Sequence, residues 1–163
     1  MMNKILVAVD NSQRNQAVFE AAVSLAQTTG ASLMLVHILA EDEPGYPTLP
    51  TYIYYPTVND RNYELYQQKL EEYKQLGIEF LQDLSQKATT LGVETEYTQL
   101  SGNPGRIICD LAKNWSADLI IVGSRGLKGL KEMFLGSVSN YVTHHAPCSV
   151  LILRSPVDSQ SQP

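Results

Sequence analysis

The chain has 163 residues, 44% of them hydrophobic, and a formal net charge of −5 from 12 basic and 17 acidic side chains. This length predicts one domain with a sizeable core, and the composition excludes a chain that is disordered throughout. The acidic balance argues against a broad nucleic-acid surface, which requires clustered positive charge. It does not exclude one small anionic ligand, because backbone amides bind phosphate without net positive charge.

Residues 1–155 are expected to form the domain, and the polar residues 156–163 are expected to be a disordered tail. No apolar run approaches the roughly 20 residues that a membrane span needs. The first residues lack a signal-peptide cleavage pattern and lead directly into an apolar run. Cys109 and Cys148 do not form the close pair of a zinc or dithiol site, so each is expected to be a small buried residue. These features predict a cytoplasmic protein without a membrane anchor.

Short apolar runs alternate with helical patterns along the chain. Strands are expected at residues 5–9, 33–39, 93–100, 119–122 and 150–153. Helices are expected at residues 17–26, 61–91 and 104–115, and from Ser137 to a stop before Pro147. Most of the strand runs are continuously apolar, as in strands covered on both faces, whereas 93–100 alternates like an edge strand. Gly77, inside the long second helix, is expected to mark a bend.

This alternation of strands and helices predicts the fold class. It implies βαβ units with parallel pairing and right-handed crossovers. Five strands and four helices fit an α/β fold with an open, doubly wound parallel sheet and helices on both faces. The last strand, Val150–Leu153, would lie at a sheet edge, where an apolar strand needs a covering helix or a partner strand.

Residues 40–60 interrupt the pattern with four prolines and four tyrosines. A regular helix is excluded there, and the segment follows the second strand at the sheet edge where ligands of open α/β sheets bind. The segment is expected to be a lid or partner contact, or else a surface insert that packs on the long second helix.

The most informative stretch, from Val122 to Ser139, holds four of the ten glycines and leads from an apolar strand into a helix. A helix start offers free N–H groups and partial positive charge, and glycine lets a ligand approach the backbone. Neither standard phosphate-loop pattern fits the spacing. The residues alone therefore predict either a phosphate site or a long glycine-containing connection.

Gly123-x2-Gly126-x9-Gly136-Ser137 resembles the G-2x-G-9x-G-[S/T] signature of the nucleotide-binding branch of the universal stress protein family. Further blocks resemble the family in the same order. These are the first strand with its acidic end, the second strand, the turn before the third helix and the last helix-to-strand join: Lys4–Asp10, Val36–Ile38, Gly102–Pro104 and His145–Val150.

The resemblance implies a Rossmann-like sheet of order 3-2-1-4-5 with an ATP site at its switch point. It also implies that Mg or Mn accompanies the ATP. Asp10 would bind the ribose hydroxyls and could hold the divalent metal. The other implied nucleotide-binding residues are Ala8, Val9, Val36, His37, Ile38, Val122, Gly123, Arg125, Gly126, Gly136, Ser137, Val138 and Ser139. The family also implies a homodimer formed through the last strand, Val150–Leu153.

Several of these side chains have structural alternatives. Asp10 also fits a helix N-cap, a role compatible with ribose binding. His37 fits a core or pocket-wall position, and the His144-His145 pair fits a helix C-terminus. Glu41-Asp42-Glu43 is expected to be a solvated run of charge.

The leading functional hypothesis is an ATP-binding sensor or regulator. The alternatives are a slow metal-dependent ATPase or phosphotransferase, a sensor of AMP or cyclic AMP, and an interaction module that binds no nucleotide.

Overall fold

The computed structural model describes residues 2–12, 14–43, 45–48, 60–124 and 136–154. The predictions for residues 49–59, for Arg125 and Gly126, and for the tail 156–163 lie outside these residues. All five predicted strands are present, with bounds within two residues of those expected. They are β1 (Lys4–Ala8), β2 (Ser32–Leu39), β3 (Thr95–Ser101), β4 (Leu119–Gly123) and β5 (Ser149–Leu153).

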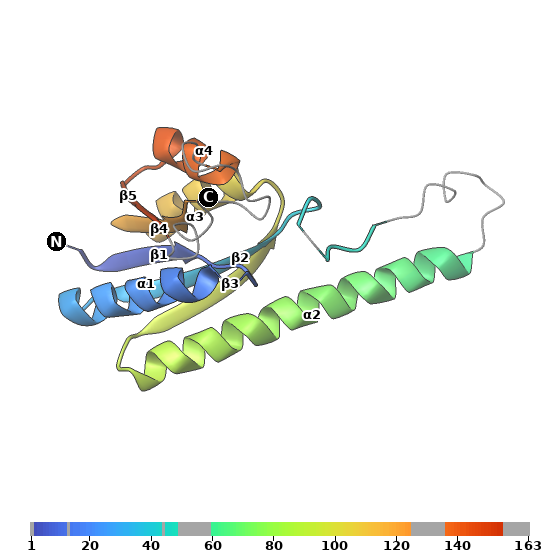
Figure 1. Cartoon of the computed structure of the whole chain (residues 1–163), viewed down its shortest axis with the longest axis horizontal. Coiled ribbons are helices and arrows are strands. Elements are labelled where there is room, and N and C mark those ends of the chain that lie inside the picture. Colours follow the sequence, from blue (N-terminus) through green and yellow to red (C-terminus); the bar gives the residue numbers. More distant parts are fainter. Residues whose placement is uncertain (1, 13, 44, 49–59, 125–135, 155–163) are drawn as a thin grey trace, which may run out of the picture.

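The sheet is parallel throughout and has the order β3-β2-β1-β4-β5, which confirms the predicted fold class. The strands β2 and β3 lie on one side of β1, and β4 and β5, which come later in the chain, lie on the other side (Figure 1). The switch point therefore lies between β1 and β4, and the carboxyl ends of these two strands open a crevice there.

Four helices cover the two faces of the sheet: α1 (Asn15–Thr29), α2 (Asp60–Thr90), α3 (Pro104–Trp115) and α4 (Ser137–His145). The helices α1 and α2 lie on one face, and α3 and α4 lie on the other (Figure 1). None of the described helices is both long and apolar enough to cross a membrane.

Two apolar layers hold the sheet between the helices. One layer joins α1 and α2 to residues such as Leu35, and the other joins α3 and α4 to residues such as Val36. Successive residues of β2 thus supply opposite layers, which explains why its sequence is apolar without alternation. Leu81 of α2 is fully buried, and burying a leucine side chain contributes about 1.5–3 kcal/mol to folding.

The helix α2 is one continuous element of 31 residues that runs straight, so the bend predicted at Gly77 is wrong (Figure 1). Gly77 instead marks a close contact between α2 and side chains of β2 and β3. A β-carbon at this position would stand 2.9 Å from Nδ1 of His37 and closer still to Nε2 of Gln99. Glycine is needed here for a close approach between backbone and side chains.

The predicted start of α3 at Pro104 is correct. The Asn103 side chain caps this helix by accepting a hydrogen bond from the Arg106 amide at 3.1 Å. Both cysteines are free thiols. Cys109 is buried as predicted, whereas Cys148 is only partly buried.

The last strand, β5, lies at the sheet edge as predicted, paired only with β4. Its Leu151 side chain remains 38% exposed. Within the described part of the chain, an apolar strand edge is therefore left without a neighbouring strand.

Candidate functional site

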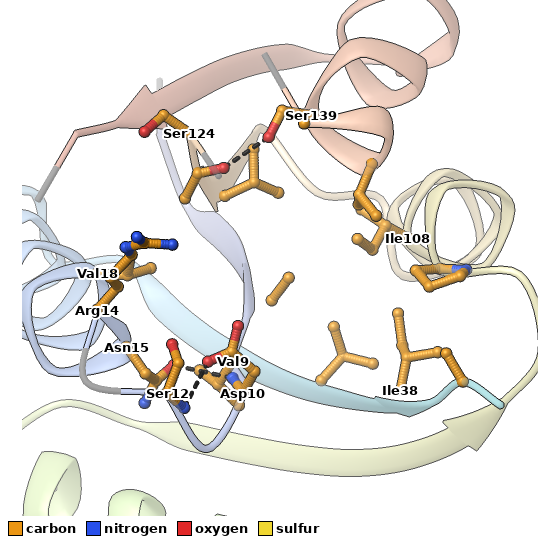
Figure 2. Close-up of a pocket in the computed structure, with 18 of the residues that line it drawn as sticks. Val9, Asp10, Ser12, Arg14, Asn15, Val18, Ile38, Ile108, Ser124 and Ser139 are labelled. Atoms are coloured by element: carbon orange, nitrogen blue, oxygen red, sulfur yellow. Dashed lines mark hydrogen bonds between the residues drawn. The ribbon is translucent and has the colours of Figure 1, made fainter. Parts of the chain in front are cut away.

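A pocket with a volume of about 210 Å³ opens at the carboxyl ends of β1, β2 and β4. Residues from these strands and from the starts of α1, α3 and α4 surround it (Figure 2). The residues that line it are Ala8, Val9, Asp10, Ser12, Arg14, Asn15, Val18, Val36, Ile38, Ala40, Asp42, Glu43, Pro104, Ile108, Val122, Gly123, Ser124, Gly136, Ser137, Val138, Ser139 and Leu153.

One wall of the pocket is apolar. Val36 and Ile38 of β2 and Pro104 and Ile108 at the start of α3 line this wall, and Figure 2 shows Ile38 and Ile108 on the same side of the pocket. Ile108 is 1% exposed and Val36 is fully buried, so the packed core fixes both side chains. Such a rigid apolar surface suits a planar aromatic ring.

Asp10 follows β1 and lies at the base of the pocket. Its Oδ1 accepts the Ser12 amide at 2.8 Å, and its own amide donates to Oδ1 of Asn15 at 3.0 Å. The helix α1 begins only at Asn15, and its N-cap residue, Arg14, makes no side-chain cap bond. The predicted N-cap role of Asp10 is therefore wrong. Instead, Asp10 closes an Asx turn that leaves its second carboxylate oxygen without a bond to the described backbone.

The start of α4 lies on the other side of the pocket from Asp10 (Figure 2). Ser137, Val138 and Ser139 are the first residues of this helix, and their amides have no helical acceptor among the described residues. The Gly136 amide, in contrast, donates to the Ser124 carbonyl at 3.0 Å. Three successive amides, rather than four, thus remain to bind an anion.

Two features of the glycine segment differ from those of a typical phosphate loop. The Ser139 hydroxyl donates to the Gly123 carbonyl at 2.6 Å, so it joins α4 to β4 and is not a free hydroxyl donor. Neither Gly123 nor Gly136 has the positive φ angle that would favour glycine. A β-carbon on Gly123 would meet only Val18, at an ordinary 3.6 Å, so the folded protein has room for it.

His37 differs from its neighbours in β2. Its side chain is absent from the pocket lining and points to the α2 face, because side chains alternate along a strand. Only the backbone of His37 is available to a ligand in the pocket. The sequence prediction of a buried structural histidine is correct, since the residue is 4% exposed.

The prediction that Glu41-Asp42-Glu43 is a solvated run of charge is wrong for Glu43. Glu41 and Asp42 are exposed, but the Glu43 side chain is 9% exposed and contacts His37 and Tyr73. Asp42 and Glu43 both line the pocket, as Asp10 does, but the Glu43 carboxylate is turned to His37 and Tyr73. Among the described residues, no group of three or more His, Cys, Asp or Glu side chains forms a metal site by itself.

Sequence reasoning missed several residues that the fold brings to the pocket. Asn15, Pro104 and Ile108 lie far from the glycine signature, and an asparagine or proline at a helix start has an ordinary capping explanation. The i, i+4 spacing of Pro104 and Ile108 placed them on one face of α3, but nothing local indicated what that face meets. Arg125 and Gly126 lie outside the described residues.

The order of the sheet and the crevice at its switch point define a doubly wound α/β protein of Rossmann-like architecture. The model of the universal stress protein family matches residues 1–154. Among curated relatives, universal stress protein Sll1388 of Synechocystis sp. is 40% identical over 151 residues, which span 93% of this chain and 97% of the relative. Universal stress protein YxiE of Bacillus subtilis is 37% identical over 154 residues, spanning 94% of this chain and all of the relative. This chain belongs to the universal stress protein family.

Solved structures agree with this assignment at the level of the fold. Hypothetical protein MJ0577 superposes with a TM-score of 0.76 at 21% identity, covering 94% of this chain and 96% of that protein. A universal stress protein in complex with cAMP gives a TM-score of 0.61 at 21% identity, covering 94% of this chain and 97% of that one. An Arabidopsis thaliana family protein with AMP bound gives 0.63 at 21% identity, covering 99% and 96%.

Proposed function

We propose that this protein binds an adenine nucleotide, ATP foremost, and acts as a nucleotide-dependent sensor or regulator in the stress response. One observation carries the proposal. A single pocket combines an apolar wall, a carboxylate at the end of the central strand and the amides at the start of α4. These three elements match the three chemical parts of a nucleotide: base, ribose and phosphate.

Each part of the pocket has a proposed partner. The adenine ring would lie between the β2 end, at Val36 and Ile38, and the α3 residues Pro104 and Ile108. The free carboxylate oxygen of Asp10 would accept hydrogen bonds from the ribose hydroxyls. The phosphates would meet the amides at the start of α4, where the helix dipole favours negative charge. Arg125 and Gly126 remain part of the proposed phosphate site on the strength of the family signature.

A divalent cation fits this arrangement in one way. Magnesium is commonly held by one or two carboxylates together with substrate phosphates. Asp10 is the carboxylate that we propose would hold Mg or Mn beside the phosphates. Such an ion would offset part of the negative charge of the triphosphate.

Isothermal titration with ATP, using the Asp10→Asn variant, tests the proposal. Asparagine keeps an oxygen for the Ser12 amide but cannot replace the second carboxylate oxygen, so the loop should persist while ribose binding is lost. We expect Kd to rise about tenfold or more, the size of a lost hydrogen bond to a charged group. Asp83→Asn is the matched control, because Asp83 is 61% exposed on α2. Equal affinities in wild type and Asp10→Asn would refute the assigned ribose contact.

Thermal unfolding gives a second measure. A ligand at 100 times its Kd stabilises the folded state by about 2.7 kcal/mol, which raises Tm by about 5–11 °C for a domain of this size. If ATP, ADP, AMP and cyclic AMP all leave the wild-type Tm and heats of titration unchanged, the protein is an interaction module without nucleotide binding.

A second candidate, a sensor of AMP or cyclic AMP, is favoured by the two structural neighbours that hold these ligands. Competition titration separates it from ATP preference. A slow ATPase is tested in the same samples, because metal-dependent ADP release that disappears in Asp10→Ala would indicate catalysis.

We further propose that the protein is a cytoplasmic homodimer in which two β5 strands pair across a two-fold axis. The exposed edge at Leu151 supports the pairing, and the free thiols of Cys109 and Cys148 suit a reducing compartment. Sedimentation analysis should find a dimer for the wild type and a monomer for Leu151→Lys, since a charged edge residue discourages strand pairing. A wild-type monomer would refute the dimer.

A further inference from the structure

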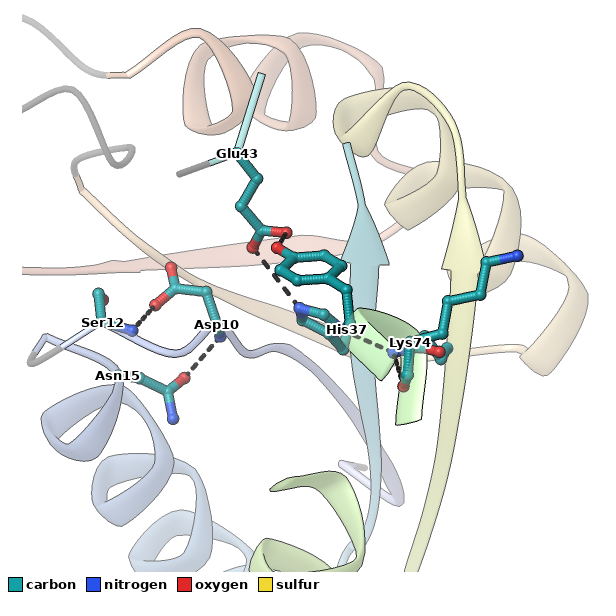
Figure 3. Close-up of polar contacts among 8 residues, drawn as sticks. Asp10, Ser12, Asn15, His37, Glu43 and Lys74 are labelled. Carbon is teal, nitrogen blue, oxygen red and sulfur yellow. Dashed lines mark hydrogen bonds and ion pairs between the residues drawn. The ribbon is translucent and has the colours of Figure 1, made fainter. Parts of the chain in front are cut away.

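A partly buried polar cluster lies beside the pocket, between the end of β2 and α2. It consists of Glu43, His37, Tyr73 and Gln99 (Figure 3). Glu43 lines the pocket and belongs to this cluster at the same time. The cluster therefore connects the pocket wall to a helix that itself contributes no residue to the pocket lining.

The hydrogen-bond pattern assigns a direction to each contact. The Gln99 amide nitrogen donates to the Lys74 carbonyl at 3.1 Å and lies 3.1 Å from Nδ1 of His37. Nδ1 must then accept, so the proton of neutral His37 is on Nε2, which faces Oε1 of Glu43 at 3.5 Å. The Tyr73 hydroxyl donates to the other oxygen of Glu43. Burial, together with this bond to Glu43, raises the pKa of Tyr73.

The backbone around Glu43 shows what these contacts hold in place. The Glu43 amide donates to the Ala40 carbonyl, and the Tyr46 amide donates to the Glu43 carbonyl, each at 3.0 Å. The Tyr46 ring meets the Tyr73 ring edge-on, with centroids 5.5 Å apart. The chain thus turns sharply after β2, and its attachment to α2 depends on Tyr73 both through the hydroxyl and through the ring.

We propose that Glu43 is a positioning residue that fixes the pocket wall Ala40–Glu43, and that Tyr73 of α2 holds the Glu43 side chain in place. Nucleotide affinity then depends on a contact outside the pocket. This inference rests on the proposed function and adds a coupling between the pocket and α2. If the pocket wall is held against α2 in a smaller fraction of the molecules, the apparent affinity for nucleotide falls in proportion to that fraction. By linkage, bound nucleotide must strengthen the contact between the wall and α2.

Glu43 could instead act on the ligand directly through its charge, and two substitutions distinguish these roles. Glu43→Gln keeps an oxygen for His37 and an amide for the Tyr73 hydroxyl, which can accept as well as donate. Glu43→Ala removes both contacts. Positioning requires that glutamine preserve affinity and alanine lose it, whereas direct action through charge requires that both substitutions change affinity.

The experiment is a double-mutant cycle with ATP titration of the full chain. We expect Tyr73→Phe to raise Kd about five- to tenfold, within the usual range of couplings between sites. Glu43→Ala should raise Kd at least as much, and the Glu43→Ala/Tyr73→Phe double variant should be no weaker than Glu43→Ala alone. Glu43→Gln should stay within about twofold of the wild type. The control is Tyr63→Phe, because Tyr63 is 49% exposed on the same helix.

Amide hydrogen exchange supplies a measurement that would not respond to ATP if Tyr73 had a purely structural role. ATP should slow amide exchange in residues 70–76 of α2 in the wild type and not in Tyr73→Phe. Unchanged affinity in Tyr73→Phe, or glutamine behaving like alanine at position 43, would overturn the inference and leave nucleotide binding intact. Failure of the wild type to bind any adenine nucleotide would overturn the proposed function and this coupling together.

Discussion

Replacing Gly77 with alanine is expected to destabilise the protein, although the same change normally stabilises a helix. Alanine gains about 1 kcal/mol over glycine in a helix interior. Here the added methyl group would stand 2.9 Å from Nδ1 of His37 and closer still to Nε2 of Gln99. Neither neighbour moves freely, because Gln99 bonds both His37 and the Lys74 carbonyl and His37 faces Glu43.

The magnitude follows from these contacts. Overpacking a filled site costs about 1–3 kcal/mol. Displacing the Gln99 amide gives up two hydrogen bonds, each with a net value of about 1 kcal/mol. After the gain of about 1 kcal/mol in helix propensity is subtracted, the net loss of folding free energy is about 2–4 kcal/mol. For a domain of this size this corresponds to a fall in Tm of about 4–16 °C.

Urea unfolding followed by circular dichroism measures this change. Gln75→Ala, at an exposed position of the same helix, is the control and should stay within about 0.5 kcal/mol of the wild type. In a Gln99→Ala background the cost of Gly77→Ala should shrink, because the nearest obstacle is gone. A stability increase in Gly77→Ala would refute the close approach of α2 to the sheet at this point.

Three further outcomes follow from the packing and electrostatics. The amides of Asn3 and Lys4 donate hydrogen bonds to the Asp118 carboxylate and hold its pKa below the ordinary 3.8, so it stabilises the fold above that pH and ceases to do so as the pH falls through the lowered pKa. When the free energy of unfolding is measured against pH in the acid range, Asp118→Asn should show a smaller pH dependence than the wild type. An equal pH dependence in both proteins would contradict this assignment. Burial raises the pKa of Cys109, so alkylation of its thiol at neutral pH should be far slower than in the urea-unfolded chain, and equal rates would show an accessible thiolate. Leu81→Ala should lower the free energy of unfolding in urea by about 2–5 kcal/mol, because Leu81 is fully buried between α2 and the sheet. A loss below about 1 kcal/mol would mean that α2 packs elsewhere.

Local patterns were sufficient to predict the elements and their type. A run such as Leu33–Leu39 has to be covered on both faces, and helical spacing before and after it provides the cover. The Asn103-Pro104 start of α3 was equally predictable, because capping depends on neighbours in the chain. The strand order came from the family resemblance, since pairing between strands far apart in sequence leaves no local mark.

The candidate site was predicted in part. Residues at strand ends, such as Asp10 and Gly123, were identified from the family resemblance, and they meet in the pocket because parallel strands bring their carboxyl ends to one edge. Asn15 and Ile108 were missed because their place in the pocket depends on how α1 and α3 pack on the sheet. The direction of the His37 side chain was also decided by the strand's register in the sheet.

The sequence alone determined the order of strands and helices, the acidic balance and the glycine signature with its helix start, because each is a property of adjacent residues. Tertiary structure alone decided that Glu43 turns inward to His37 and Tyr73, and that Gly77 is a contact and not a bend. These groups are separated along the chain and meet only when α2 lies against β2 and β3. The role of a charged residue or a glycine depends on these tertiary contacts, because burial and hydrogen-bond partners set how much the residue contributes to the free energy of folding.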